Sequence, residues 1–337
     1  MKKSLTTVAV AASAMMVSMV SQAAPTDLVK VYGTVHSSLD REVMSNDTRY
    51  SLDSSSRRGW ALGAKGSADA AGSGLQVIYK FEVGFDGSKD VATGVSDTDD
   101  DGMIDAISSS DPGHFYLRDS WVGVIGGFGK IRMGTMATFY KSTGAMIDPL
   151  FTTALEGRDN KLGMMSGQHA GNGVGKGRGR DMISFDSPTI SKIFRFNVHL
   201  QPRGDSWNYG GGAKLQVGPA TLFGAVTSDE VGDLAMKAGA KLVFGPASLG
   251  AHYERGDALG EKQYGFVSAS YQITKELQLA ANAGYELDSS DVGGAGAVQY
   301  QLAKASTAYV GYGRNLLGSG STGTSYTVTT FGLRHKF

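Results

Sequence analysis

Cysteine is absent from this sequence of 337 residues, which excludes disulfides, thiolate metal sites and a cysteine nucleophile. Proline is scarce at 7 residues, whereas glycine is abundant at 48. That balance is typical of curved strands joined by tight turns and not of a helical bundle. Charge of one sign is not in excess either, because 32 basic residues accompany 32 acidic ones. A broad basic surface is therefore not expected, and we predict no nucleic-acid partner.

Long apolar runs are also missing, with one short exception near the N-terminus. There, Lys2 and Lys3 precede an apolar stretch from Val8 to Val20, and small residues follow it up to Ala23. This is the pattern of a secretory signal peptide, so we predict cleavage after Ala23, a leader at residues 1–23 and a single mature domain at 24–337. No other segment approaches the ~20 apolar residues that a transmembrane helix requires. If the mature chain enters a membrane, it enters as strands.

What the sequence does contain is apolar residues at every second position. The segment from Leu75 to Phe85 keeps this two-residue period over a membrane-spanning length, and the segment from Glu276 to Leu287 repeats it. The final residues alternate too, with Phe331, Leu333 and Phe337 on one predicted face and charged residues on the other. One face of such strands suits lipid and the other suits water, which is typical of an outer-membrane β-barrel.

An internal repeat indicates how these strands connect. The segments from Gly212 to Leu222 and from Gly239 to Leu249 read alike at an offset of 27 residues, which fits one hairpin plus one return loop. Gly-Pro pairs mark tight turns at one end, while longer polar loops mark the other. We predict an all-β fold, a transmembrane antiparallel up-and-down barrel of sixteen strands near residues 27–39, 56–68, 74–86, 114–124, 128–134, 180–187, 192–202, 208–217, 219–228, 234–244, 246–255, 262–273, 275–286, 292–302, 304–313 and 325–337.

A barrel of this size is too wide for side chains to fill, so the lumen should be a water channel unless a loop narrows it. The third outer loop, at about 135–179, is long enough to fold inward. Its glycine-rich end from Gly171 to Gly179 resembles a phosphate-binding loop only superficially, because Lys176 is not followed by Ser or Thr and the next segment is a predicted strand. We interpret that end as a flexible return to the sixth strand.

The second outer loop contains a candidate calcium site. Its aspartates Asp97, Asp99, Asp101 and Asp105 include alternate positions, and a glycine occupies the sixth position, as in loops that wrap one calcium ion. The twelfth position is Ser108 and not Glu, and flanking helices are not expected, so an EF-hand is excluded but a free-standing calcium loop is not. The alternative is a solvated acidic loop that binds divalent ions loosely. A bound Ca²⁺ would have a structural role, and no cofactor is required.

The remaining chemistry-bearing residues give no pattern of a catalytic or metal site. No serine nucleophile motif is present. The histidines show no metal-ligand spacing, so we expect structural or lumen-wetting roles for His36, His114, His169, His199, His252 and His335.

Several segments together resemble the Gram-negative general porins, a family of trimeric, sixteen-stranded diffusion channels. The segments run from Leu62 to Gly66, from Arg118 to Gly134, from Arg180 to Pro188 and from Gly332 to Phe337. Each motif alone is degenerate, but their order and spacing cover nearly all of the mature chain. The resemblance implies a homotrimer in the bacterial outer membrane that contacts lipid and lipopolysaccharide. It also implies passive diffusion of ions and small hydrophilic solutes, with no enzymatic activity.

The resemblance further implies a pore constriction. In that family the third loop presents carboxylates across from a ladder of basic side chains on the wall. Carried over to this sequence, the basic wall comprises Arg118, Arg180 and Lys65. The family's further arginine falls at Ala61 here, and Arg57 could partly substitute for it.

The acidic side of the constriction is less conventional. The loop tip has Leu150 where the family has a glutamate, which leaves Asp148, Glu156 and Asp159 as the candidate loop acids.

On the fourth strand, Asp119 is expected to face outward beside Leu117 and Trp121. Because a carboxylate facing hydrocarbon is costly, we expect this side to abut another subunit.

Three alternatives to a general diffusion channel stay open at this point. A substrate-selective channel of the same architecture would show saturable flux or block by one solute class. A plugged barrel that acts as a surface adhesin or scaffold would show no conductance. An outer-membrane hydrolase is the least expected, because it would need a Ser and His pair near one rim.

Overall fold

The computed structural model describes residues 25–337 apart from 46, 54–59, 71, 86–94, 97–105, 108–114, 159–160, 172 and 174. Its strands are β1 (Pro25–Met44), β2 (Asp47–Asp53), β3 (Ala61–Ala70), β4 (Leu75–Phe85), β5 (Val95–Ser96), β6 (Ala106–Ile107), β7 (Phe115–Leu117), β8 (Ser120–Gly126), β9 (Gly129–Ala137), β10 (Arg178–Asp186), β11 (Phe194–Arg203), β12 (Ser206–Val217), β13 (Ala220–Ser228), β14 (Leu234–Phe244), β15 (Ala247–Arg255), β16 (Tyr264–Gln272), β17 (Leu277–Glu286), β18 (Asp291–Ala303), β19 (Ser306–Leu316) and β20 (Tyr326–Lys336). The short helices of these ranges are α2 (Phe139–Ile147), η2 (Gly167–His169) and η3 (Asp257–Leu259). None of the helices in the described ranges has the length and apolar character needed to cross a bilayer.

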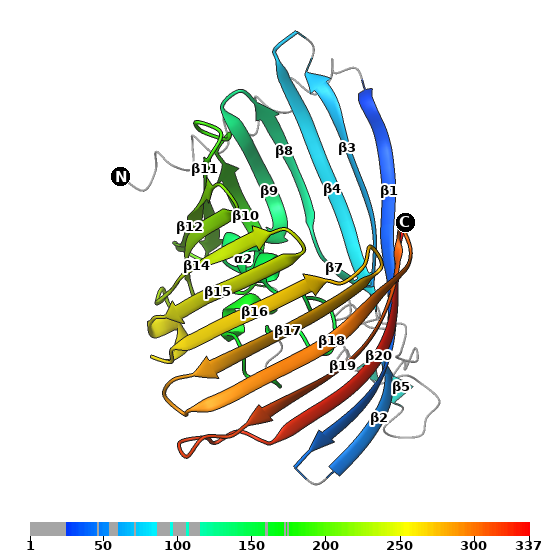
Figure 1. Ribbon diagram of the computed structural model, residues 1–337. Coiled ribbons are helices and arrows are strands. Elements are labelled where there is room, and N and C mark those ends of the chain that lie inside the picture. Colours follow the sequence, from blue (N-terminus) through cyan, green and yellow to red (C-terminus); the bar gives the residue numbers. More distant parts are fainter. Residues whose placement is uncertain are drawn as a thin grey trace.

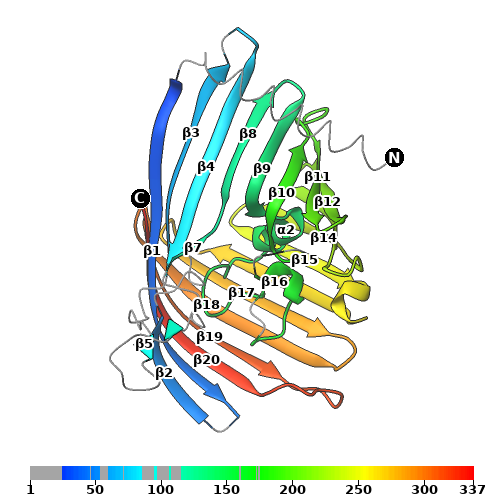
Figure 2. The ribbon, with the colours of Figure 1, turned by 180° about the vertical axis from the view of Figure 1, so that it is seen from behind.

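The strands form a closed antiparallel barrel (Figure 1, Figure 2). Strand β1 closes the ring, because it pairs with β3 along one edge and with β20 along the other. The main sheet has 18 strands, and two of its positions are each filled by two consecutive strands. Strands β2 and β3 pair with successive parts of β1, and β7 and β8 pair with successive parts of β4. The elements therefore fill sixteen strand positions, which confirms the predicted fold class.

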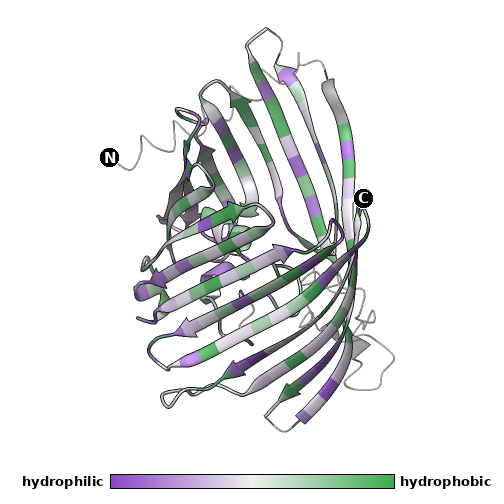
Figure 3. Cartoon of the chain, viewed as in Figure 1, coloured by the Kyte–Doolittle hydropathy of each residue, from purple (hydrophilic) through white to green (hydrophobic). Residues whose placement is uncertain are grey.

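Side-chain alternation explains why these segments form barrel strands. In β16, Val267 is exposed and Ser268 is buried. In β20, Phe331 is 58% exposed while Thr330 is 1% exposed, so consecutive residues belong to opposite faces. Figure 3 shows hydrophobic and hydrophilic residues alternating along the strands. The exposed apolar face suits lipid, and the polar face lines the inside of the ring.

Tight turns join the strands at one end, as the Gly-Pro pairs predict. Gly218 (φ 54°) lies between β12 and β13, and Gly245 (φ 55°) lies between β14 and β15. Both have the left-handed conformation that glycine adopts without steric cost. Strand β14 begins and ends at the predicted residues 234 and 244.

The last residue packs against the first strand. The backbones of Gly33 and Phe337 exchange two hydrogen bonds, at 3.0 Å and 3.1 Å. A Cβ atom at Gly33 would overlap the Phe337 ring, so the aromatic side chain lies directly over this glycine. The terminal aromatic residue thus takes part in closing the barrel.

Residues 138–177, between β9 and β10, form a long connection that we call the β9–β10 segment. It packs against the polar face of the strands and supplies about half of the main buried apolar cluster. Ile147, Leu150, Leu155, Leu162 and Met164 of the segment are buried in one cluster with Phe223, Phe266, Tyr326 and Val328 of the strands. The core therefore lies between the segment and the barrel wall.

Candidate functional site

Helix α2 opens the β9–β10 segment and is held by polar groups at both ends. The side chain of Thr138 caps its N-terminus by accepting a hydrogen bond from the backbone N–H three residues later, at 3.2 Å. At the other end, Lys241 Nζ of β14 donates to the Met146 carbonyl at 2.8 Å, and Ser268 of β16 donates to the Ile147 carbonyl. These wall donors satisfy carbonyls that have no partner within the helix. The wall thus fixes the position of α2.

Asp148, a predicted loop acid, is buried where α2 ends. Its Oδ1 accepts hydrogen bonds from Leu150 N and Asn282 Nδ2, both at 2.9 Å, and its Oδ2 accepts one from Gly157 N at 2.7 Å. Burial raises the pKa of this carboxyl to about 6, although the hydrogen bonds oppose the rise. Asp148 therefore organises the segment, and its carboxyl already accepts three hydrogen bonds.

Glu156, the second predicted loop acid, is buried as well. Its Oε2 accepts a hydrogen bond from Thr152 N at 2.8 Å, and its Oε1 lies 2.8 Å from Arg158 Nε. The Arg158 guanidinium in turn lies 4.3 Å from the centre of the Phe151 ring. Because an adjacent cation balances Glu156, this pair contributes little net charge. The third predicted loop acid, Asp159, lies outside the described residues.

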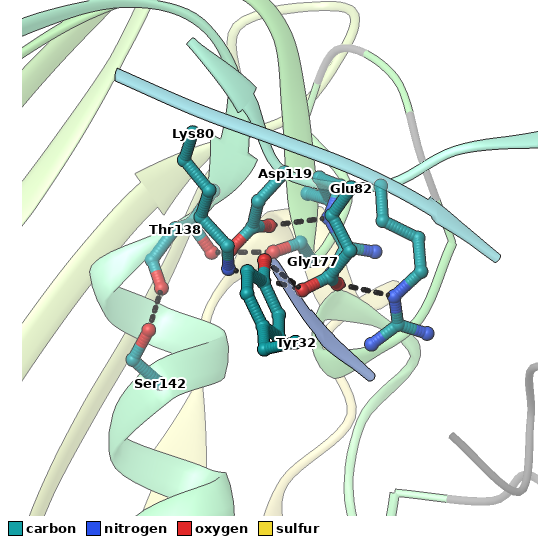
Figure 4. A network of polar contacts seen from close by, with 9 residues as sticks. Tyr32, Lys80, Glu82, Asp119, Thr138, Ser142 and Gly177 are labelled. Atoms are coloured by element: carbon teal, nitrogen blue, oxygen red, sulfur yellow. Dashed lines mark hydrogen bonds and ion pairs between the residues drawn. The ribbon is translucent and has the colours of Figure 1, made fainter. Parts of the chain in front are cut away.

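Arg118, a predicted wall arginine, belongs to a polar network beside the first strands (Figure 4). Its Nε lies 2.6 Å from Glu82 Oε1, and Glu82 Oε2 accepts a hydrogen bond from the Tyr32 hydroxyl at 2.8 Å. Lys80 Nζ lies 3.2 Å from the same carboxylate. Phe81 between them is exposed, so Lys80 and Glu82 lie on the inner face of β4. Lys80 and Glu82 were not among the predicted constriction residues, although the alternation around Phe81 could have indicated both.

Asp119 corrects one prediction, because it faces this inner network and not a neighbouring subunit. Its Oδ2 accepts a hydrogen bond from Lys80 Nζ at 2.8 Å, and its Oδ1 accepts one from Arg178 Nε at 2.9 Å. The cause is an extra residue between β7 and β8, since an advance of three residues along β4 matches an advance of four along β7 and β8. Such a bulge breaks the alternation, and the consecutive residues Arg118 and Asp119 face the same side.

Arg180, the other predicted wall arginine, is exposed, and Gln201 Nε2 donates to its backbone carbonyl at 2.7 Å. The arginine that contacts Asp119 is Arg178, two residues earlier. Arg178 and Arg180 differ in environment because β10 has a bulge beside them. Residues 180–182 of β10 lie opposite only two residues, 134–135, of β9. Asp181 within this bulge has a left-handed backbone, with φ 52°.

The remaining predicted residues are either exposed or outside the described ranges. Lys65 is exposed, with its Nζ 5.2 Å from the centre of the Tyr32 ring. The structure does not describe Arg57 or the candidate calcium ligands Asp97, Asp99, Asp101 and Asp105. The flanking strands β5 and β6 pair with each other and bring the two ends of that loop together.

A group of basic side chains between α2 and strands β9 to β13 was not expected. This basic patch lines a cavity of about 720 Å³ and consists of Lys130, Arg132, Lys192, Arg195 and Lys214. Among the residues that line the cavity, the acid is Asp186, at 2.7 Å from Arg132 and 3.3 Å from Lys130. Lys214 Nζ lies 5.3 Å from the centre of the Phe139 ring of α2. The cavity therefore has an excess of positive charge.

Comparison with known proteins identifies the class. The profile of the Gram-negative porin family matches residues 6–318, so the chain belongs to this family. A search of curated proteins gave no match. The family and the fold are those of an outer-membrane diffusion channel rather than an enzyme.

Solved structures share the fold at low sequence identity. The anion-selective porin from Comamonas acidovorans superposes with a TM-score of 0.72 at 19% identity, covering 92% of this chain and 100% of that one. OmpF of Salmonella typhi, in complex with daunomycin, gives 0.69 at 13% identity, with 92% and 97% covered. The trimer form of OmpT from Vibrio cholerae gives 0.62 at 14% identity, with 92% and 99% covered.

Proposed function

We propose that the β9–β10 segment lies in the lumen and forms the constriction of a channel for passive diffusion of ions and small hydrophilic solutes. The contacts of the segment with distant strands carry this proposal. Gln299 Nε2 of β18 donates to the Pro149 carbonyl at 3.1 Å, and Arg334 Nη1 of β20 donates to the Thr152 hydroxyl at 3.1 Å. A segment that leaves β9 and reaches β18 and β20 through their polar faces has to cross the ring.

The charges at the segment favour anions over cations as permeant ions. Asp148 and Glu156 are buried and bonded, whereas the basic patch has five cationic side chains and one facing carboxylate. Positive side chains along a pore lower the barrier for anions. We therefore propose an anion preference, which is the property named for the similar porin of Comamonas acidovorans.

We propose a homotrimer that contacts outer-membrane lipid and lipopolysaccharide. The exposed apolar faces of the strands and the trimer form of the similar OmpT support this assembly. Cross-linking of the detergent-extracted protein tests the assembly, and a product no larger than a monomer would contradict it.

Cleavage after Ala23 and a structural Ca²⁺ bound by Asp97, Asp99, Asp101 and Asp105 are two further proposals. The intact mass of protein extracted from outer membranes decides the first, because a chain beginning at Ala24 is expected. Calcium titration of the wild type and of Asp99→Asn decides the second, and equal binding by the two proteins would contradict it.

Proteoliposome swelling with neutral sugars of increasing size tests the channel itself. We expect rapid swelling with the smallest sugars and a steep decrease with solute size, because a constriction discriminates by size. Liposomes with heat-denatured protein are the control. Absence of swelling from folded protein with every sugar would contradict the proposal and favour a plugged barrel.

A further inference from the structure

Three side chains of types that bind metals converge where the β9–β10 segment touches β15. They are His169, at the end of η2, and His252 and Glu254, on β15. His169 Nε2 lies 2.9 Å from Glu254 Oε1, and His252 Nε2 lies 2.7 Å from the same oxygen. The three atoms lie within 4.8 Å of one another. The sequence spacing of the histidines gave no such indication, because the fold joins a segment and a strand far apart in the chain.

The cluster is fully enclosed. The side chains of His252 and Glu254 are 0% exposed, and that of His169 is 1% exposed. His252 Nδ1 has no hydrogen-bond partner among the described residues, and His252 Nε2 is near Glu254 but not aligned for a hydrogen bond. A buried imidazole in this state is costly unless another group bonds to it.

We propose that His169, His252 and Glu254 bind a divalent transition-metal ion of the zinc class. Two imidazole nitrogens and one carboxylate oxygen form a known zinc ligand set that leaves a fourth position open. Zinc bonds to nitrogen and oxygen of about 2.0–2.2 Å place tetrahedral ligand atoms about 3.3 Å apart. The two short distances to Glu254 Oε1 would therefore open by about 0.5 Å, which side-chain rotation can supply. Ions of the calcium class are disfavoured, because they select oxygen ligands.

Neighbouring side chains prepare these ligands. The hydroxyls of Tyr140 and Ser166 both donate to Oε2 of Glu254, which fixes the carboxylate with Oε1 toward the histidines.

One neighbouring charge opposes metal binding. Lys237 Nζ donates to the Tyr140 carbonyl and lies 4.2 Å from the centre of the Tyr140 ring, near the cluster. Its positive charge repels a cation, so it should weaken metal binding.

A bound ion would join the β9–β10 segment to the wall. One ligand belongs to the segment and two belong to β15, so the ion would restrain the segment at this point. Binding does not depend on whether the barrel conducts, and a result here is separate from the test of the proposed channel.

Metal titration of the folded, full mature protein in detergent tests the proposal. After EDTA treatment and dialysis, Zn²⁺ binding is measured in competition with a chromophoric chelator, and Co²⁺ binding by visible absorption. We expect one ion per chain and the intense visible bands of tetrahedral Co²⁺. His169→Ala and His252→Ala should each weaken binding about 100-fold, because each removes one ligand bond. His199→Ala removes a buried histidine outside the cluster and should leave binding unchanged.

Two results would overturn the site. One is wild-type binding equal to that of the His169→Ala/His252→Ala double variant, and the other is an equal loss with His199→Ala. Only variants that keep heat-modifiable migration are compared. If the alanine variants do not fold, the Co²⁺ spectrum of the wild type decides alone, because weak octahedral bands contradict the proposed ligand set.

Discussion

Arg178 Nε lies 2.9 Å from Asp119 Oδ1, and this contact joins the first residue of β10, directly after the β9–β10 segment, to the bulge between β7 and β8. The two side chains are 8% and 19% exposed. Lys80 contacts the other carboxylate oxygen at 2.8 Å. The pair therefore fixes the segment where it returns to the wall.

Arg178→Gln should lower the stability of the barrel by about 1–3 kcal/mol, because a largely buried carboxylate loses one of its cationic partners. The transition temperature of heat-modifiable migration on gels measures the loss. The double variant Arg178→Gln/Asp119→Asn should lose less than the sum of the single variants. Arg180→Gln, at an exposed position of the same strand, is the matched control. Equal transition temperatures for Arg178→Gln and Arg180→Gln would show that the pair has no such role.

Gly293→Ala should narrow the channel. A Cβ atom there would overlap the carbonyl of Leu162, so the β9–β10 segment has to move away from β18 and further into the lumen. Single-channel conductance should fall relative to the wild type. Gly294→Ala is the control, because its Cβ would have its nearest contact at 3.8 Å, an ordinary separation. If both variants conduct like the wild type, the segment does not limit the current at this point.

Asp148 should make the stability of the β9–β10 segment depend on pH. Its folded pKa of about 6 lies above the ordinary value of 3.8, so the native state holds the proton more tightly. The resulting stability is fully present below pH 3.8 and is lost as the pH rises through about 6, by up to about 3 kcal/mol. Hydrogen-exchange protection of residues 148–157, corrected for intrinsic rates, should fall over this range. Asp148→Asn should remove the slope, and an unchanged slope in that variant would assign the effect to another group.

The basic patch should set ion preference. Arg195→Gln/Lys214→Gln removes two of its positive charges and should shift the reversal potential in a salt gradient toward cations. Lys275→Gln changes an exposed lysine in the turn between β16 and β17 and should leave the reversal potential unchanged. Equal reversal potentials for the wild type and the double variant would place selectivity elsewhere in the pore.

The sequence predicts the barrel well because each strand encodes its own two faces. The alternation around Phe331 and the turns at Gly218 and Gly245 are local signals, and the structure agrees with all of them. The two bulges were not predicted. The extra residue beside Asp119, for example, becomes visible only from how β7 and β8 pair with β4. A bulge in β10 likewise explains why Arg178, and not the predicted Arg180, belongs to the network.

The candidate site could be predicted only in part. Asp148 and Glu156 belong to the β9–β10 segment and Arg118 lies on the wall between β7 and β8, but the partners of all three depend on tertiary contacts. Asn282, which bonds to Asp148, is 134 residues away in the chain. The approach of His169 to His252 and Glu254 likewise follows from the tertiary contact of the segment with β15.

Current recording in a planar bilayer under a salt gradient tests the central claim most directly. If the protein is an open trimeric channel with a positively charged pore, the current should close in groups of three steps. The reversal potential should have the sign expected when anions are more permeant than cations. Silence from folded, heat-modifiable protein would contradict the open channel. A reversal potential of the sign set by cations would contradict the assignment of selectivity to the basic patch.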